Sequence, residues 1–316
     1  MSRRSLRLPH LFIPRRHSST AAPLLTQDIK SSSFTGHVRI LELNRPQARN
    51  ALSIELVTAL RREILNIRDQ YLEDGREKPS LDNAGLLPTR ALVVASAVDE
   101  CFCAGADLKE RLGFTPDQTS SFLALLRTTL NDLSTLPIPT ISAISSLALG
   151  GGLELALATH FRILTANAEV GLPETRLAII PGAGGTHRLP NLIGRARARD
   201  IILTGRRVAG PEAYRIGLAD RLIKVRPREA HVLDGSCSPK ASLLREARVA
   251  ARDEALHLAN EICKGGPIAV RAALEAVDDA SPSSEADMYD RVVDTHDRGE
   301  ALRAFVEKRK PVFTGR

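Results

Sequence analysis

Two glutamates stand in segments that are otherwise apolar or rich in glycine. Glu154 is the single charged residue of the run LALGGGLELALA, residues 147–158, in which three glycines precede an apolar helical segment. Glu174 follows twenty positions later, after a proline and before the glycine cluster 181–185. A carboxylate in such a segment is costly unless it is paired or used. Alternatively, Glu154 complements a helix dipole and Glu174 is an exposed turn residue.

Two stretches of small residues could supply backbone N–H donors to a ligand. Residues 104–106 lie in FCAGADLKE, and residues 150–152 lie at the start of a predicted helix. Small residues allow close approach to the backbone, and the first amides of a helix have no intrahelical acceptor. Each stretch alone is typical of tight packing. Together, two donors that converge on one oxygen would form an oxyanion hole.

The elements that must position these residues alternate between strands and helices. Strand patterns cover residues 37–43, 91–96, 140 onward, 161–166 and 222–225. Helical spacing follows Ser53, a predicted N-cap, and recurs over 117–133. This alternation predicts an α/β fold with parallel strands over residues 28–225.

The last part of the sequence is predicted to be helical. Four helical runs follow one another without a strand between them, at residues 241–264, 267–279, 285–296 and 299–309. We therefore predict a helical C-terminal subdomain over residues 241–316. Residues 226–240, with two prolines, read as a linker.

The N-terminal residues differ in charge from the rest of the chain. Residues 1–27 contain five arginines and no lysine, aspartate or glutamate, and removing them lowers the formal charge from +7 to +2. This composition predicts a mitochondrial transit peptide, cleaved between about residue 18 and Asp28. A basic tail is the alternative. No apolar run reaches the roughly 18–20 residues of a spanning helix, so we expect no membrane insertion.

The sequence lacks the usual patterns of metal and nucleotide sites. The four cysteines and the isolated histidines show no zinc-ligand spacing, so we predict no metal and buried, reduced cysteines. There is no G-x-S-x-G elbow, phosphate-binding P-loop or G-x-G-x-x-G fingerprint.

Five segments, in order, resemble the signature segments of the enoyl-CoA hydratase/isomerase (crotonase) superfamily. They are LNRPQARNALS (43–53), FCAGADLKER (102–111), LALGGGLELALA (147–158), GLPETRLAIIPGAGGTHRLP (171–190) and FVEKRKPVFTG (305–315). The resemblance covers about residues 36–316. It implies a crotonase-like spiral of ββα units and a helical C-terminal region used for trimerisation. Members of the superfamily are commonly homotrimers or homohexamers.

The resemblance also implies roles for individual residues. The amides of Ala106 and Gly151 would form the oxyanion hole, Glu154 and Glu174 would be the catalytic carboxylates, and the amide of Gly182 would help to hold water. Residues expected on the coenzyme A side of the substrate are Arg45, Ala48, Ala104, Gly105, Asp107, Leu108 and Lys109. No further cofactor is implied, because coenzyme A is part of the substrate.

The implied reaction is hydration of an α,β-unsaturated acyl-CoA. Glu174 is expected to act at the α-carbon and Glu154 to position water, although the division is open. The segments are most similar to the members that hydrate 3-methylglutaconyl-CoA in leucine breakdown in the mitochondrial matrix. The distal carboxylate of 3-methylglutaconyl-CoA would need a cation in the site, and the candidates are Lys109, Arg111 and Arg176. Short-chain enoyl-CoA hydration in fatty-acid β-oxidation is the alternative.

RNA binding is the alternative from another functional class. The 3-methylglutaconyl-CoA hydratases also bind AU-rich RNA through a lysine-rich N-terminal helix. In the corresponding segment here, residues 53–76, arginines alternate with acidic residues and no lysine occurs. The pattern favours a solvated amphipathic helix, and the charge of +2 beyond the leader is a weak electrostatic basis for RNA binding.

Overall fold

The computed structural model describes residues 22–30, 35–72, 75–78, 88–225 and 238–316. Residues 1–21 of the predicted leader and residues 226–237 of the predicted linker lie outside these ranges. The first strand, β1 (Leu24–Lys30), pairs along its whole length with β2 (His37–Leu43). β1 is therefore part of the sheet, and a boundary at residue 27, as predicted, would divide it.

A six-stranded sheet forms the centre of the fold. Its order is β1-β2-β3-β5-β7-β10, with β3 (Thr89–Ser96), β5 (Thr140–Ile144), β7 (Phe161–Thr165) and β10 (Arg221–Ile223). The strands from β2 to β10 are parallel, and only β1 pairs antiparallel. The predicted parallel α/β arrangement is confirmed.

A second sheet contains strands too short to be recognised in the sequence. It has the order β4-β6-β8-β9, from β4 (Cys101–Cys103), β6 (Leu147–Leu149), β8 (Glu169–Gly171) and β9 (Val208–Ala209). Two or three residues cannot display the alternation by which a strand is predicted. The chain passes from one sheet to the other and then through a helix (β3-β4-α3, β5-β6-α4), which confirms the spiral of ββα units.

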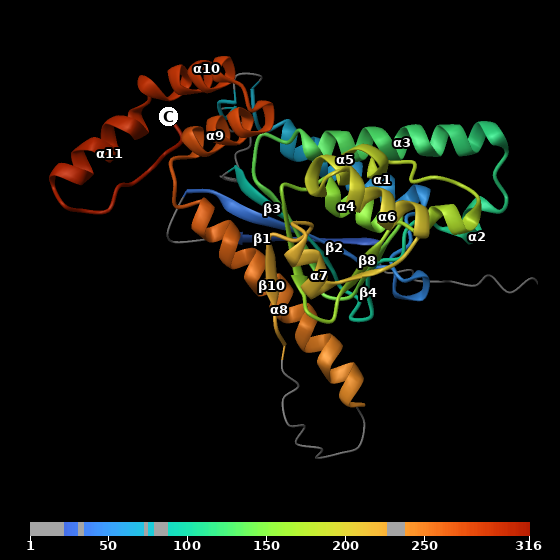
Figure 1. The fold of residues 1–316 in the computed structure, drawn as a ribbon. Coiled ribbons are helices and arrows are strands. Elements are labelled where there is room, and N and C mark those ends of the chain that lie inside the picture. The colour runs from blue at the N-terminus through green and yellow to red at the C-terminus, as the bar shows by residue number, and fades with distance from the viewer. Residues whose placement is uncertain (1–21, 31–34, 73–74, 79–87, 226–237) are drawn as a thin grey trace, which may run out of the picture.

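The two faces of the large sheet are covered by different helices. Alternate residues of β2 and β3 point to opposite faces. Leu41 and Val94 lie in a cluster with α1 (Ile54–Arg68) and α3 (Pro116–Ser134). Ile40 and Val93 lie in a second cluster with α8 (Pro239–Ile262). Figure 1 shows α1 and α3 above the sheet and α8 below it.

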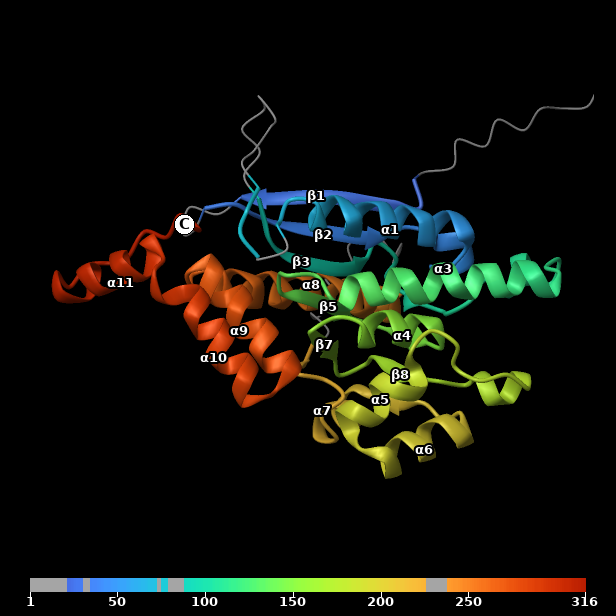
Figure 2. The same ribbon diagram turned by 90° about the horizontal axis from the view of Figure 1, so that it is seen from above.

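This arrangement changes the predicted boundary of the C-terminal region. Ala251, Ala255 and Ala259 of α8 are fully buried against the large sheet, so α8 is a layer of the core and not part of a separate subdomain. The helices that project from the core are α9 (Pro267–Asp279), α10 (Pro282–Val293) and α11 (His296–Val306), as both views show (Figures 1 and 2). In the described ranges, no helix is long and apolar enough to cross a membrane.

Short helices connect the strands near the second sheet. They are α2 (Leu108–Arg111), α4 (Gly151–Leu157), α5 (Gly185–Ile193), α6 (Arg195–Thr204) and α7 (Gly210–Arg215), with the 3-10 helices η1 (Pro46–Ala48) and η2 (Glu174–Leu177). β4 and β6 are parallel neighbours, so α2 and α4 begin at the same edge of their sheet. Both predicted donor segments are therefore brought to one place.

Candidate active site

One cavity, of about 480 Å³, collects most of the predicted site residues. Both donor segments, both predicted glutamates and aliphatic side chains from α3 and the segment after η2 line it. The lining residues are Ala104, Gly105, Ala106, Leu108, Arg111, Thr119, Leu123, Leu126, Arg127, Gly150, Gly151, Glu154, Pro173, Glu174, Leu177, Ile179, Ile180, Gly182 and Ala183. The cavity thus combines a few polar groups with a largely apolar wall, as small-molecule sites do.

The amides of Ala106 and Gly151 lie side by side on the wall of this cavity. A Cβ atom built on Gly151 would be 3.8 Å from the amide nitrogen of Ala106. Among the backbone hydrogen bonds of the described residues, neither N–H group has an acceptor. Two adjacent amides that point at no protein acceptor can both donate to one ligand oxygen.

Glycine is required where the two segments approach each other. Gly105 has a φ of +96°, and a Cβ there would lie 2.7 Å from the carbonyl oxygen of Leu149. A Cβ on Gly152 would lie 2.2 Å from the carbonyl oxygen of Cys103. Both distances are shorter than a non-bonded contact allows. The glycines therefore let α4 pack directly on the end of β4, which sets the spacing of the two amides.

Glu154 is buried and held by two backbone amides. Its side chain is only 2% exposed, and Oε1 accepts hydrogen bonds from the N–H groups of Ala183 at 2.7 Å and Gly185 at 2.9 Å. Burial raises the pKa of this carboxyl, while the two hydrogen bonds oppose the rise because they stabilise the carboxylate. The glycine cluster after Glu174 thus fixes the orientation of Glu154.

Glu174 faces the same cavity in a different environment. It is the first residue of η2 and 9% exposed, and its buried Oε2 has no hydrogen-bond partner among the described residues. Burial raises the pKa of Glu174 to about 7, and the nearby negative charge of Glu154 adds to the rise. Near neutral pH, this carboxyl can therefore both give and take a proton.

The residues predicted on the coenzyme A side have two kinds of position. Ala104, Gly105 and Leu108 line the cavity, whereas Arg45, Ala48, Asp107 and Lys109 do not. Arg45 donates to the Asp107 carboxylate at 3.0 Å and to the carbonyl of Ala51. Asp107 in turn caps α2 by accepting from the Glu110 amide. This pair joins the segment around η1 to α2, and a contact of either residue with coenzyme A stays a prediction.

Sequence reasoning missed the residue that connects η1 to the second sheet. Asn50 is fully buried, and its side-chain amide donates to Ser96 Oγ at 2.8 Å and to the carbonyls of Cys101 and Phe102 at 3.2 and 3.0 Å. Its side-chain oxygen, Oδ1, accepts from the backbone N–H of Arg45 at 2.7 Å. Asn50 has a φ of +56°, a conformation that asparagine adopts more readily than most residues. The asparagine within the motif of residues 43–53 is the sequence feature that could have indicated this role.

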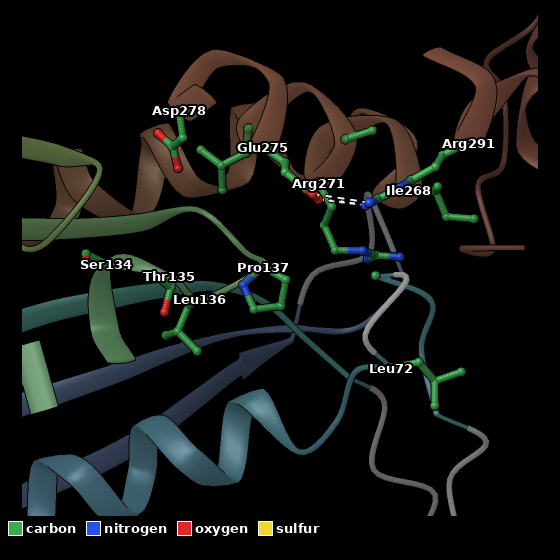
Figure 3. Close-up of a pocket in the computed structure, with 13 residues that line it drawn as sticks. Leu72, Ser134, Thr135, Leu136, Pro137, Ile268, Arg271, Glu275, Asp278 and Arg291 are labelled. Carbon is green, nitrogen blue, oxygen red and sulfur yellow. Dashed lines mark hydrogen bonds and ion pairs between the residues drawn. The ribbon is translucent and has the colours of Figure 1, made fainter. Parts of the chain in front are cut away.

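A second cavity, of about 300 Å³, lies between the C-terminal helices α9 and α10 and residues 134–137 at the end of α3, and none of the predicted site residues line it. Figure 3 shows its charged side chains. Glu275 accepts two hydrogen bonds from Arg291, at 2.6 and 3.2 Å. Arg271 donates to Glu77 at 3.1 Å and lies over the ring of Tyr71. Most of these charged side chains are thus paired with other residues of the protein. The first cavity is therefore the candidate active site.

The raised pKa of Glu174 predicts a pH-dependent effect of Glu174→Gln on stability. The folded pKa of about 7 lies above the ordinary value of 4.5, so the unfolded chain loses this proton first as pH rises. The wild type should therefore lose stability between about pH 4.5 and 7, and the glutamine variant should not. The measured quantity is the free energy of unfolding of the variant minus that of wild type. Allowing for solvent screening, we expect this difference to be about 1–2 kcal/mol larger at pH 8 than at pH 4.5. Urea unfolding at fixed protein concentration measures this difference, and a pH-independent difference would contradict it.

Comparisons with known proteins agree with this geometry. The family model described as enoyl-CoA hydratase/isomerase matches residues 33–316. A protein of Pyricularia oryzae named methylglutaconyl-CoA hydratase 1, mitochondrial, is 59% identical over 305 residues, which cover 93% of this chain and 87% of that protein. An enoyl-CoA isomerase/hydratase of Zymoseptoria tritici is 53% identical and covers 92% and 90% of the two chains. The crystal structure of an enoyl-CoA hydratase from Bacillus anthracis matches with a TM-score of 0.75 at 36% identity, over 93% of this chain and 100% of that one. The chain therefore belongs to the enoyl-CoA hydratase/isomerase family.

Proposed function

We propose that this enzyme is a hydro-lyase that adds water across the α,β double bond of an acyl-CoA thioester, with 3-methylglutaconyl-CoA as its preferred substrate. One observation carries the reaction type. Two carboxyl groups in different environments, Glu154 and Glu174, line the same cavity as two amides that have no acceptor in the part of the chain that the structure describes. Family membership supports the acyl-CoA substrate class.

The two amides are suited to the thioester oxygen. When water adds to the β-carbon, negative charge moves onto this oxygen as the thioester becomes enolate-like. The N–H groups of Ala106 and Gly151 would donate to the oxygen and stabilise the charge. Because their positions are fixed by packing between α4 and β4, little reorganisation would accompany the reaction.

The environments of the glutamates favour a division of roles. Glu154 accepts two N–H bonds, which stabilise its ionised form, so it would take the proton from the attacking water. Glu174, with a pKa of about 7, would hold the proton that is delivered to the α-carbon. Hydroxide is thus added at the β-carbon and a proton at the α-carbon. One proton passes in net terms from Glu174 to Glu154, and exchange with solvent restores both groups.

The proposed substrate, cellular location and oligomeric state rest on the named relatives and on the resemblance of the sequence to the family. The relative from Pyricularia oryzae, 59% identical, carries the name methylglutaconyl-CoA hydratase, mitochondrial, which supports this substrate and a mitochondrial location. We include in the proposal a matrix location, removal of an N-terminal leader before Leu24, and assembly as a homotrimer or homohexamer through the C-terminal helices. Short-chain enoyl-CoA hydration remains the alternative within the same mechanism.

The basic residues of α1 give RNA binding little support. Arg61 and Arg68 both donate to the carboxylate of Asp132, each at 2.8 Å. Arg62 lies 3.4 Å from the carboxylate of Glu63. Arginines already paired with acids neutralise fewer phosphates than free ones. We therefore do not propose RNA binding as a second function, and an RNA affinity that falls steeply with salt would contradict this choice.

A direct assay tests the proposed function. Protein that begins upstream of Leu24, so that β1 is complete, would be given 3-methylglutaconyl-CoA and crotonyl-CoA, and loss of the conjugated thioester absorbance would be followed. We expect a kcat/KM at least tenfold higher for 3-methylglutaconyl-CoA. A preference for crotonyl-CoA would keep the mechanism and support the short-chain alternative. Hydration of neither substrate would overturn the proposal.

A further inference from the structure

The three basic residues that are candidates to bind the distal carboxylate lie in different positions. Of Lys109, Arg111 and Arg176, only Arg111 lines the cavity that holds Glu154 and Glu174. Arg176 is turned toward α6, where its Nε and Nη2 donate to the carbonyl of Thr204 at 3.1 and 3.0 Å. Lys109 is exposed on α2.

Arg111 is supported by a neighbouring ring but has no counter-ion in direct contact among the described residues. Its guanidinium carbon lies 4.7 Å from the ring centre of Phe122, which supports one face of the group. No salt bridge of Arg111 occurs among the described residues, and its buried Nε lacks a hydrogen-bond partner there. Leaving a buried donor unpaired is costly, and the cost is recovered when an acceptor binds.

We propose that Arg111 binds the distal carboxylate of the acyl group and so makes this enzyme selective for dicarboxylic acyl-CoA substrates. The inference rests on the proposed function, whose site it extends. Arg111 is the last residue of α2, which begins two residues after the Ala106 amide, so one short segment would bind both ends of the acyl group. A planar guanidinium matches a carboxylate with two parallel hydrogen bonds.

Charge balance in the cavity supports this role. Glu154 and Glu174 already raise the negative charge of the site, and both act electrostatically on Arg111. A further carboxylate, from the substrate, would be repelled by whichever of the two glutamates is ionised unless a cation offset the charge. The aliphatic wall, which includes Leu123 and Ile180, offers no such group.

Arg127 is the other cation on the cavity wall. Its Nε donates to the carbonyl of Gly182 at 2.6 Å, and the residue is exposed. Because the Gly182 carbonyl holds it and solvent screens it, Arg127 is a weaker receptor for a carboxylate than Arg111.

Substrate discrimination by Arg111→Met tests the proposal. The substrates are 3-methylglutaconyl-CoA and 3-methylcrotonyl-CoA, which has the same branched chain without the distal carboxylate. We expect Arg111→Met to lower kcat/KM about a hundredfold for the first, mainly through KM, and by about tenfold or less for the second, because loss of the Arg111 charge also acts on the pKa values of Glu154 and Glu174, which serve both substrates. Arg111→Lys should restore part of the loss. Arg176→Met is the matched control, for which the ratio of the two kcat/KM values should stay as in wild type.

Binding of unreactive analogues separates this inference from the proposed reaction. Calorimetry would compare glutaryl-CoA with valeryl-CoA, which differ in the terminal carboxylate. Wild type should bind glutaryl-CoA more tightly, and Arg111→Met should abolish the preference, even if the hydration assay fails. Equal losses for both substrates, an unchanged preference in Arg111→Met, or a loss confined to Arg127→Met would each overturn the proposal.

Discussion

Replacing Glu174 with glutamine is expected to lower kcat for hydration about a thousandfold, because the variant cannot hold the proton that the α-carbon receives. Glutamine has nearly the shape of the protonated carboxyl, so the cavity should keep its form. The unpartnered Oε2 of Glu174 means that no protein hydrogen bond of this atom is lost on substitution. Single-turnover hydration of 3-methylglutaconyl-CoA measures the chemical step, and the urea midpoint at pH 5 shows whether the variant is folded.

Glu154→Gln is the matched variant, because it keeps an oxygen that can accept from Ala183 and Gly185. It should also slow hydration, but the two variants should differ in exchange of the α-hydrogen. With glutaryl-CoA in deuterated water, Glu174→Gln should stop incorporation of deuterium at the α-carbon, whereas Glu154→Gln should retain it. The reverse pattern would exchange the two roles, and full hydration activity in Glu174→Gln would overturn the proposed mechanism.

The pKa of Glu174 also bears on the pH profile of the reaction. Hydration and its reversal need one proton shared between the two glutamates, since one gives a proton and the other takes one. The doubly ionised pair, which forms as pH rises through about 7, lacks the proton for the α-carbon. Activity should therefore fall above neutral pH, and the apparent pKa values belong to the pair rather than to either residue.

Apart from β1, which the predicted leader boundary divides, the strands of the large sheet and their helices were predictable because their signals are local. The strand at 37–43 and the helix after Ser53 appear with nearly the predicted bounds, and Ser53 accepts from the Leu56 amide as a cap should. The apolar residues that keep helical spacing from Val57 to Ile67 face the core as predicted, whereas Ile54, at the start of the helix, is 44% exposed. Elements of this length contain enough residues for the apolar repeat to be visible in the sequence, every 2 residues in a strand and every 3.6 residues in a helix.

The second sheet and the support of the site depend on contacts between distant residues. β4 and β6 have three residues each, and their pairing joins segments 46 positions apart, Cys101 with Leu147. Likewise, the hydrogen bond from Arg45 to Asp107 and the two amides bound to Glu154 leave no periodic pattern in the sequence. The resemblance indicated which residues matter, but only the fold shows that Asp107 is a helix cap paired with Arg45.

Gly151→Pro is expected to reduce kcat/KM a further hundredfold to thousandfold below that of Gly151→Ala, because proline has no N–H for the thioester oxygen. Gly151 is the first residue of α4, a position where proline is tolerated since its N–H has no intrahelical acceptor. The substitution therefore removes the proposed donor at a position where the helix does not use the N–H group.

Gly151→Ala is the control for the added side chain. In both variants, the new Cβ would lie 3.0 Å from Leu52 Cδ1, the end of a flexible side chain, so both share this contact, and proline adds the rest of its ring. The difference between them isolates the amide and the proline ring. Hydration rates and thermal midpoints of both variants would be measured together. If the two variants are equally stable and equally active, the Gly151 amide does not stabilise the enolate, and the charge on the thioester oxygen must be met by the Ala106 amide alone.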